Sequence, residues 1–417
     1  MTSARPVKRL RRFAADTRPL AVPAFRRTVV GQGAAVIGTM VTEVAVPVQV
    51  YDISRSSFDV GLVGLAGLVP ILVFGLYGGA VADAVDRRRL TLGSSVLTWS
   101  VTLALLTQAL AGLRSVPLLL ALVAVQAGGF AVSSSVRGAI TPALVPVALV
   151  PAANALSYTV STVGQVLGPV VAGVLIGLPG GFGYAYGADA VLFTAALYAA
   201  FRLPPLPPSA PIGRPGLRAV VEGLRFLAGR KVLLTSFLVD IAAMVLAMPR
   251  ALFPEAAETR WHGGAGLLYS SIALGAVVAG VFSGWIGRVR RQGVALIVAV
   301  AVWGCAVALA GVAPSLWLAV CLLGIAGAAD LVSAVYRQTI LQTSVPDHLR
   351  GRLQGVFTVV VAGGPSLGDL RAGALAAVLP LTVAWSAPAV LCAVLVVVGG
   401  LLAGPFRRYT GESREDA

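Results

Sequence analysis

Long apolar segments follow one another along the chain, separated by short stretches that hold most of the charged residues. Each segment is close to twenty residues, the length that crosses ~30 Å of hydrocarbon as a helix. Lipid offers the backbone no hydrogen-bond partners, so such segments are expected to be helical. The pattern predicts twelve membrane-spanning helices, numbered here as spans 1 to 12, at residues 29–50, 60–82, 91–112, 115–136, 153–177, 184–201, 232–253, 265–287, 294–313, 315–336, 354–378 and 382–404.

The composition supports this interpretation. Of the 417 residues, 57% are hydrophobic and only 12% are charged, with a mean hydropathy of +0.88. A soluble protein is about one quarter charged. The predicted fold class is therefore an all-α integral membrane protein.

A second pattern is a repeat at one fixed spacing. Two hundred residues separate Arg137 from Arg337, Val145-Pro146 from Val345-Pro346, Gly168 from Gly368, and Gly173 from Gly373. Duplicated helical units are common in secondary transporters, which hold their substrate where the two copies meet. The repeat predicts that the twelve spans form two pseudo-symmetric six-helix bundles.

Positive charge is distributed unevenly over this map. One set of alternate loops, together with both termini, holds 27 of the 32 Lys and Arg residues; the other set holds Arg55, Arg114, Arg250 and Arg260, and Arg371 lies in a span. Basic residues concentrate on the cytoplasmic side, so both termini are expected there. The net charge of +15 would suggest nucleic acid in a soluble protein. Here it indicates the anionic lipid surface as partner, and no nucleic acid.

A proline-rich stretch after Leu203 divides the chain, because proline removes helix donors and favours extended backbone. The basic N-terminal arm precedes a full-length span without a small-residue cleavage site, so it does not read as a removable signal. The predicted organisation is a basic cytoplasmic arm at 1–28, a six-helix bundle at 29–202, a cytoplasmic linker at 203–231, a second bundle at 232–404 and a cytoplasmic tail at 405–417.

Carboxyl side chains at three positions are informative: Glu43 lies in span 1, Asp240 in span 7 and Asp330 in span 10. A carboxylate at bilayer depth costs ~2.5–3.5 kcal/mol, so each is expected to face a cavity or a partner. Spans 1, 7 and 10 are therefore predicted to line a water-accessible interior. Spans 3, 9 and 12 contain no charged residue and are predicted to face lipid.

The connection between spans 2 and 3 reads Gly78-Gly79-Ala-Val-Ala-Asp83-Ala-Val-Asp86-Arg87-Arg88-Arg89. Glycine allows helices to approach closely, while a carboxylate and arginines can form a charge clasp at the membrane surface. This arrangement resembles the loop signature of the major facilitator superfamily, Gly-x-x-x-Asp-(Arg/Lys)-x-Gly-(Arg/Lys)-(Arg/Lys). It matches at Gly79, Asp83, Arg87 and Arg88, and departs at Ala84, where a base is usual, and at Asp86, where glycine is usual. A cluster that only fixes topology is the alternative.

Span 5 carries Gly164-Gln-Val-Leu-Gly168-Pro169-Val-Val-Ala-Gly173. It resembles the Gly-x-x-x-Gly-Pro-x-x-x-Gly element of proton-coupled exporters in the same superfamily, where the element resists leakage. Ordinary small-residue packing is the alternative. The span also places polar residues at helical spacing, which indicates either a face toward a cavity or a seam between helices: Asn154, Tyr158, Ser161 and Gln165.

Several segments of the second half resemble the branch of the superfamily that contains enterobactin (siderophore) exporters and macrolide-type drug exporters. They are residues 237–254, 328–342 and 346–355, followed by Gly368-Asp369. The resemblance implies the major facilitator fold, two six-helix bundles that rock about a central cavity lined by spans 1, 4, 7 and 10. It further implies a monomer in the bacterial cytoplasmic (inner) membrane that exports an amphipathic small molecule without a cofactor.

An ion gradient is the expected energy source, because the chain lacks the Gly-x-x-x-x-Gly-Lys-(Ser/Thr) phosphate loop. We expect Asp240 and Asp330 to couple proton influx to export, with Glu43 as third candidate. Arg337 follows Asp330 by two helical turns, and we expect this separation to prevent a direct pair. The candidates for the substrate cavity are Gln126, Arg137, Asn154, Tyr158, Ser161, Gln165, Arg250, Ser333 and Arg337.

The expected substrate is a siderophore, whose anionic catecholates Arg137 or Arg250 would attract. A multidrug or macrolide antiporter is the alternative, and a channel, a lipid scramblase or a membrane sensor also remains open. An enzyme is the least expected class, since the loops offer no nucleophile and base constellation. Three cysteines without Cys-x-x-Cys spacing and two loop histidines indicate no metal site.

Overall fold

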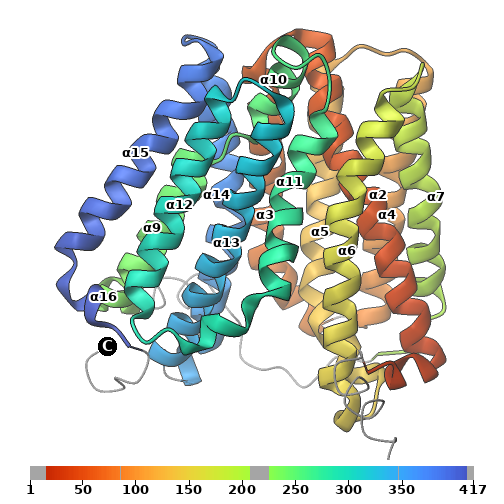
Figure 1. Ribbon diagram of the computed structural model, residues 1–417. Helices are drawn as coiled ribbons and strands as arrows, with labels where there is room; N and C mark the ends of the chain where they lie inside the picture. Colours follow the sequence, from red (N-terminus) through yellow and green to blue (C-terminus); the bar gives the residue numbers. More distant parts are fainter. Residues whose placement is uncertain (1–15, 85, 207–224, 346, 411–417) are drawn as a thin grey trace, which may run out of the picture.

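The computed structural model describes residues 16–84, 86–206, 225–345 and 347–410. Within these ranges it describes the backbone, but not the side chains, of 75–84, 135–139, 287, 342–344, 347–360 and 362. Most of the predicted arm (1–15), linker (207–224) and tail (411–417) lies outside the described residues. The described part is built from helices and their connections, without a β-strand (Figure 1).

Every predicted span coincides with a helix or a broken pair of helices. Short 3₁₀ segments precede or interrupt them at η1 (Arg18–Ala21), η2 (Val147–Leu149), η3 (Arg250–Leu252) and η4 (Ser283–Arg288). The α-helices are α2 (Pro23–Ser54), α3 (Ser57–Ala84), α4 (Arg87–Leu110), α5 (Val116–Leu144), α6 (Val150–Ile176), α7 (Gly181–Phe201), α9 (Lys231–Ala247), α10 (Phe253–Thr259), α11 (Ala265–Val281), α12 (Gln292–Val312), α13 (Leu316–Ser344), α14 (Asp347–Ala376), α15 (Leu381–Leu402) and α16 (Gly404–Arg408).

Two spans are not the continuous helices that the apolar pattern predicts. Span 7 is broken after Ala247, because Pro249 lacks a backbone donor and holds Met248 in an extended conformation with ψ 117°. The chain then continues through η3 into α10. Span 8 ends as α-helix at Val281 and tightens into η4 at Ser283-Gly284.

By length and composition, nine helical segments of the described residues can cross a membrane, and the shorter α11 is also apolar. One of the nine is the broken segment Lys231–Thr259, taken as a whole. The chain is a multi-pass membrane protein.

The repeat at 200 residues reappears in the helix boundaries. Helix α5 runs from Val116 to Leu144 and α13 from Leu316 to Ser344. Both begin at a serine, Ser115 or Ser315, whose hydroxyl accepts from the backbone N–H three residues later at 3.4 Å. The start of α7 at Gly181 likewise matches that of α15 at Leu381.

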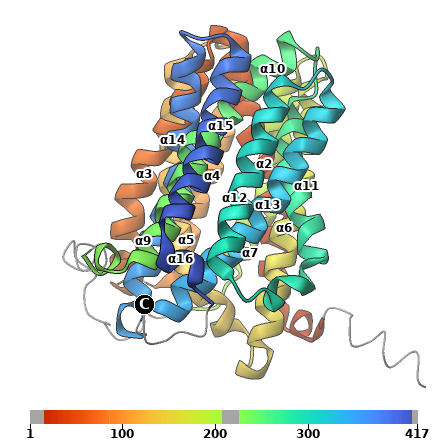
Figure 2. The same ribbon diagram turned by 60° about the vertical axis from the view of Figure 1, so that its left-hand side comes forward.

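The helices form two groups. In the first, α2 packs between α6 and α7 while α5 packs between α3 and α4; in the second, α12 contacts α9, α13 and α15. Figures 1 and 2 show the first group in red to yellow-green and the second in green to blue, with both described chain ends at one end of the molecule. We call that end the terminal side and the opposite end, which holds α10, the far side.

The groups meet along two helix pairs, α3 with α14 and α6 with α11. Glycines make these approaches possible. A Cβ on Gly61 of α3 would lie 2.8 Å from the carbonyl oxygen of Asp369, and one on Gly266 of α11 would lie 2.7 Å from the Cα of Gly173. Such contacts are too short for any other residue, so backbone-to-backbone packing joins the two groups.

Gly266 and Gly280 allow a direct test on the same helix. We expect Gly266→Ala to destabilise the protein by about 1–3 kcal/mol, because the added methyl group meets the backbone of α6. The nearest atom to a Cβ at Gly280 is 4.0 Å away, so Gly280→Ala should be neutral or slightly stabilising. Thermal unfolding of both variants in detergent measures the difference. Equal unfolding midpoints would contradict the glycine-mediated contact.

Candidate functional site

Two helices of the second group, α9 and α13, bring three ionisable side chains together. The guanidinium of Arg337 forms an ion pair with Asp240 and lies 3.5 Å, from Nη2 to Oδ1, from Asp330. Asp240 and Arg337 are buried, with 1% and 6% of their side chains exposed, whereas 34% of Asp330 is exposed. One arginine therefore serves two carboxylates, and only one carboxylate is open to solvent.

The pairing of Arg337 with Asp330 corrects the expectation that two helical turns keep these residues apart. The arginine side chain is long enough to run back along α13, as helical side chains do toward the N-terminus. Counting turns between Cα atoms therefore underestimates the reach of a guanidinium.

These residues border a cavity of about 460 Å³ between the two groups. Its wall includes Asp240, Asp330 and Arg337, together with apolar side chains such as Met244. The first group contributes Tyr158 of α6, on the opposite side. The cavity is thus mostly apolar, with charge concentrated at one place.

Other candidates for the cavity are placed differently. Ser333 is buried on α13, and the Nε2 of Gln126 on α5 is buried without a hydrogen-bond partner among the described residues.

The hydroxyl of Ser161 accepts a hydrogen bond of 3.0 Å from Gln32 of α2, so at this position the polar face of α6 is a seam between helices. Asn154 and Gln165 are exposed. Arg137 lies in α5, but its side chain is outside the described residues.

A second charged cluster lies at the break in span 7. Arg250 of η3 donates to Asp369 of α14 at 3.1 Å, and Asp369 also accepts from the backbone N–H of Ala251 at 3.2 Å. Arg371, two residues further along α14, donates to the carbonyl oxygens of Val245 at 3.1 Å and Met248 at 3.0 Å. The carboxylate of Asp369 therefore accepts from a backbone N–H group after the break, and the guanidinium of Arg371 donates to backbone carbonyl groups before it. The helix dipole favours both contacts.

Glu43 of α2 faces this cluster from the first group. Its side chain is exposed, and it interacts electrostatically with Arg250 and Asp369. The three intramembrane carboxyl groups selected from the sequence thus belong to two places, the Arg337 cluster and the break.

The far side carries polar contacts between the groups. Arg55, which ends α2, pairs with Glu258 of α10, and the Ser57 hydroxyl donates to Glu255 of the same helix. The hydrogen bond from Arg55 to Glu258 raises the pKa of the guanidinium, so Arg55 stays charged over the physiological range.

In the connection between α3 and α4, Asp86 stands where the superfamily signature has glycine, and it has a structural role. This carboxylate caps α4, accepting from the backbone N–H of Arg88 at 2.7 Å. Arg88 donates onward to the carbonyl oxygen of Phe201 at the end of α7, at 3.0 Å. The backbone of Arg87 donates to Leu206 at 3.0 Å. Gly79 and Asp83 lie on α3, and the Asp83 side chain is outside the described residues.

The glycine element of α6 divides between two partners. Cβ atoms on Gly164 and Gly168 would meet Val36 and Met40 of α2, within the first group. Gly173, one turn beyond the buried Pro169, faces Gly266 of the second group. The same element therefore packs α6 against its own group and against the opposite one.

Sequence reasoning missed one intramembrane carboxyl group, Asp189 of α7. It is fully buried and accepts from Thr42 at 2.6 Å and from Thr102 at 3.2 Å. It also gave Arg371 no partner and Asp369 no role. Counting every charge within each predicted span would have found all three, although not their partners.

The two helical groups, joined face to face around a charged cavity, have the fold of major facilitator superfamily transporters. A POT family transporter in complex with 5-aminolevulinic acid aligns with a TM-score of 0.76 at 12% identity, over 92% of this chain and 96% of that one. A bacterial homologue of the human lysosomal transporter Spinster aligns with a TM-score of 0.71 at 17% identity, over 95% and 98%. At these identities the likeness concerns the fold alone.

Within this superfamily the chain belongs to the transmembrane secretion effector family, whose model matches residues 14–411. Among similar proteins, the enterobactin exporter EntS of Citrobacter koseri is 28% identical over 397 residues, 93% of each chain. EntS of Shigella boydii is 29% identical over 367 residues, 86% of each chain. The protein is a membrane transporter related to these exporters.

The Arg337 cluster generates a stability test. We expect Arg337→Leu to destabilise the protein by about 3–5 kcal/mol, because it leaves buried Asp240 without its counter-charge. Adding Asp240→Asn to Arg337→Leu should restore part of the loss. Arg55→Gln, which breaks an exposed pair, should change the thermal midpoint little. If Arg337→Leu unfolds no earlier than Arg55→Gln, the cluster does not contribute as described.

Proposed function

We propose that this transporter exports an amphipathic organic molecule, a siderophore as first choice, in exchange for protons that enter the cell. It works by alternating access as a monomer in the bacterial cytoplasmic membrane, with both termini in the cytoplasm. Export of a siderophore is supported by the similarity to EntS over most of both chains. Nucleic acid has no part in this function.

The orientation rests on the distribution of charge. In the predicted topology, the loops on the side of both termini hold 27 of the 32 Lys and Arg residues, and cytoplasmic loops are the basic ones. The contacts between the groups involve the far-side residues Arg55, Ser57 and α10, and the glycine pairs beside them. The arrangement therefore fits a state that is closed to the outside and offers its cavity to the cytoplasm.

The proposal of proton coupling is supported chiefly by the cluster of Asp240, Asp330 and Arg337. Two carboxylates and one guanidinium leave one excess negative charge, which a single proton removes. Asp330 is the carboxylate that water reaches, so it takes the proton first. When Asp330 is protonated, Arg337 pairs with Asp240 alone. Protonation thereby changes the ionic contact that joins α13 to α9, and so favours a different packing of these two helices. Glu43, facing the second cluster, is the third coupling candidate.

Neutral substitutions test this assignment in reconstituted vesicles with a tricatecholate siderophore as probe. One proton per cycle at 100 mV supports about fiftyfold accumulation, since it carries ~2.3 kcal/mol. We expect Asp240→Asn and Asp330→Asn each to bring accumulation toward unity, while exchange of labelled for unlabelled substrate continues. Only the driven, uphill step depends on the proton.

Asp189→Asn is the matched control, because Asp189 is an intramembrane carboxyl group bonded to two threonines away from the cavity. It should retain proton-driven accumulation. Full accumulation in both cavity variants would reject their role in coupling. Absence of tricatecholate exchange by the folded parent protein would reject a siderophore as the substrate.

One observation favours the second candidate, a multidrug antiporter for cationic amphiphiles. Within the described cavity, two carboxylates already neutralise Arg337, and Asp330 is the charge that remains accessible. Such a surface attracts a lipophilic cation and repels a catecholate. Arg250, on the far side, could offset the negative charge of Asp330 toward a catecholate, but it is already paired with Asp369.

Asp330→Asn separates the two candidates by the sign of its effect. For a tricatecholate we expect binding to tighten by about tenfold, because the substitution removes a like charge from the cavity wall. For a cationic substrate such as tetraphenylphosphonium, binding should weaken by a similar factor. Titration calorimetry on purified protein measures both. Tight tetraphenylphosphonium binding that Asp330→Asn abolishes, without catecholate binding, would replace the first candidate by the second.

A further inference from the structure

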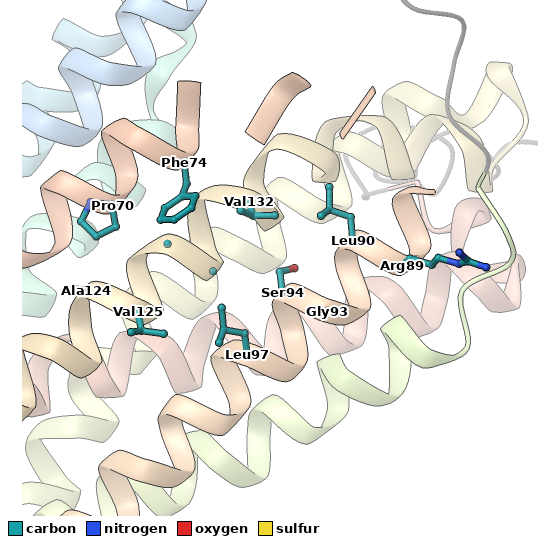
Figure 3. A pocket seen from close by; sticks show the side chains of 12 residues that line it. Pro70, Phe74, Arg89, Leu90, Gly93, Ser94, Leu97, Ala124, Val125 and Val132 are labelled. Atoms are coloured by element: carbon teal, nitrogen blue, oxygen red, sulfur yellow. The ribbon is translucent and has the colours of Figure 1, made fainter. Parts of the chain in front are cut away.

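A groove of about 500 Å³ lies on the first group of helices, away from the central cavity. Its walls come from α3, with Pro70 and Phe74, and from α4, with Leu97; its floor is α5, with Val125 and Gly128 (Figure 3). The one hydroxyl on its wall, Ser94, donates to the carbonyl oxygen of Thr91 within its own helix at 3.1 Å. The groove therefore offers an apolar surface for almost its whole length.

The groove opens toward the surrounding membrane. Phe74, Leu97 and Val125 are 46%, 44% and 44% exposed, and they belong to helices long and apolar enough to cross a bilayer. A Cβ on Gly93 of α4 would meet no atom within 4 Å. Nothing in the described part of the chain fills this space, so in a bilayer its contents are hydrocarbon.

Charge distinguishes one end of the groove. Arg89 lines it in the first turn of α4, which begins on the terminal side, and in Figure 3 it lies at the opposite end from Pro70. The first turn of α4 is Arg87-Arg88-Arg89 and carries no acidic residue. A basic site between membrane helices at the headgroup level binds anionic lipid headgroups.

We propose that the groove binds a single anionic phospholipid, with one acyl chain along α5 and the phosphate at Arg89. Shape and charge select this occupant together. The apolar length fits a hydrocarbon chain, and the arginine stands where that chain would meet its headgroup. The lipid would rest against α3, which packs against α14 across the interface between the groups, so its occupancy acts on a helix of that interface.

Gly93 and Arg89 allow the two parts of the site to be tested separately. Gly93→Phe places a bulky side chain in the groove, where an added Cβ meets no described atom within 4 Å. Arg89→Gln removes the headgroup contact. The matched controls are Gly399→Phe on α15, where a Cβ also meets nothing within 4 Å, and Arg288→Gln, an exposed arginine at the end of η4.

The probe is phosphatidylglycerol, compared with phosphatidylcholine, added to the purified full-length protein and counted by native mass spectrometry. We expect one phosphatidylglycerol to be retained preferentially. Gly93→Phe should lower retention of both lipids at least about fivefold, and Arg89→Gln should lower that of phosphatidylglycerol about fivefold, as expected for one basic residue. Both controls should retain lipid as the parent protein does.

Equal retention of the two lipids by the parent protein would overturn the anionic selectivity. Unchanged retention in Gly93→Phe, with the variant folded as judged by its thermal midpoint, would overturn the site. Unchanged lipid retention with loss of tetraphenylphosphonium or tricatecholate binding in Gly93→Phe would also overturn it, since the groove would then hold substrate. Each outcome is independent of whether the transporter is driven by protons.

Discussion

A polar group in the hydrocarbon core has no water to bind, and this constraint explains the internal structure of the protein. Arg371 gives its donors to the carbonyl groups that the break in span 7 leaves open. Asp189 receives two threonine hydroxyls, and Arg337 is shared between two carboxylates. Each of these three side chains therefore ties together helices that the apolar surfaces alone would not orient. Apolar surfaces in lipid provide little preference for one helix arrangement over another.

Stability and function make opposite demands on these charges. Asp189 is enclosed by its partners and behaves as a fixed joint within the first group. The Arg337 cluster has one carboxylate more than it has cations, and part of Asp330 is accessible. A carboxyl group enclosed by two hydroxyl donors keeps one set of partners, whereas an accessible cluster of two carboxylates and one guanidinium can exist in two states. The two networks therefore differ in the partners of their carboxylates, hydroxyl groups at Asp189 and a shared guanidinium at Asp240 and Asp330, and in access.

The sequence was sufficient for the class of fold, the order of the helices and the 200-residue repeat, because apolar length and charge asymmetry are local signals. The duplicated serine caps of α5 and α13 follow from the same repeat. Contacts across the fold were harder to predict. The role of Asp86 as a helix cap, the partners of Arg371 and the pairing of Arg337 with Asp330 depend on side-chain direction and on helix neighbours. The roles assigned to Asp240, Asp330 and Glu43 in transport remain predictions.

The break in span 7 has a mechanical consequence. Both sides of it are bound by α14, through Asp369 on one side and Arg371 on the other. Helix α10 follows η3, which Asp369 bonds to α14, and α10 in turn bonds Arg55 and Ser57 of the first group. A tilt of α14 would move η3, and with it the start of α10. Pro249 thus separates the part of span 7 that bears Asp240 from the part that contacts the first group on the far side.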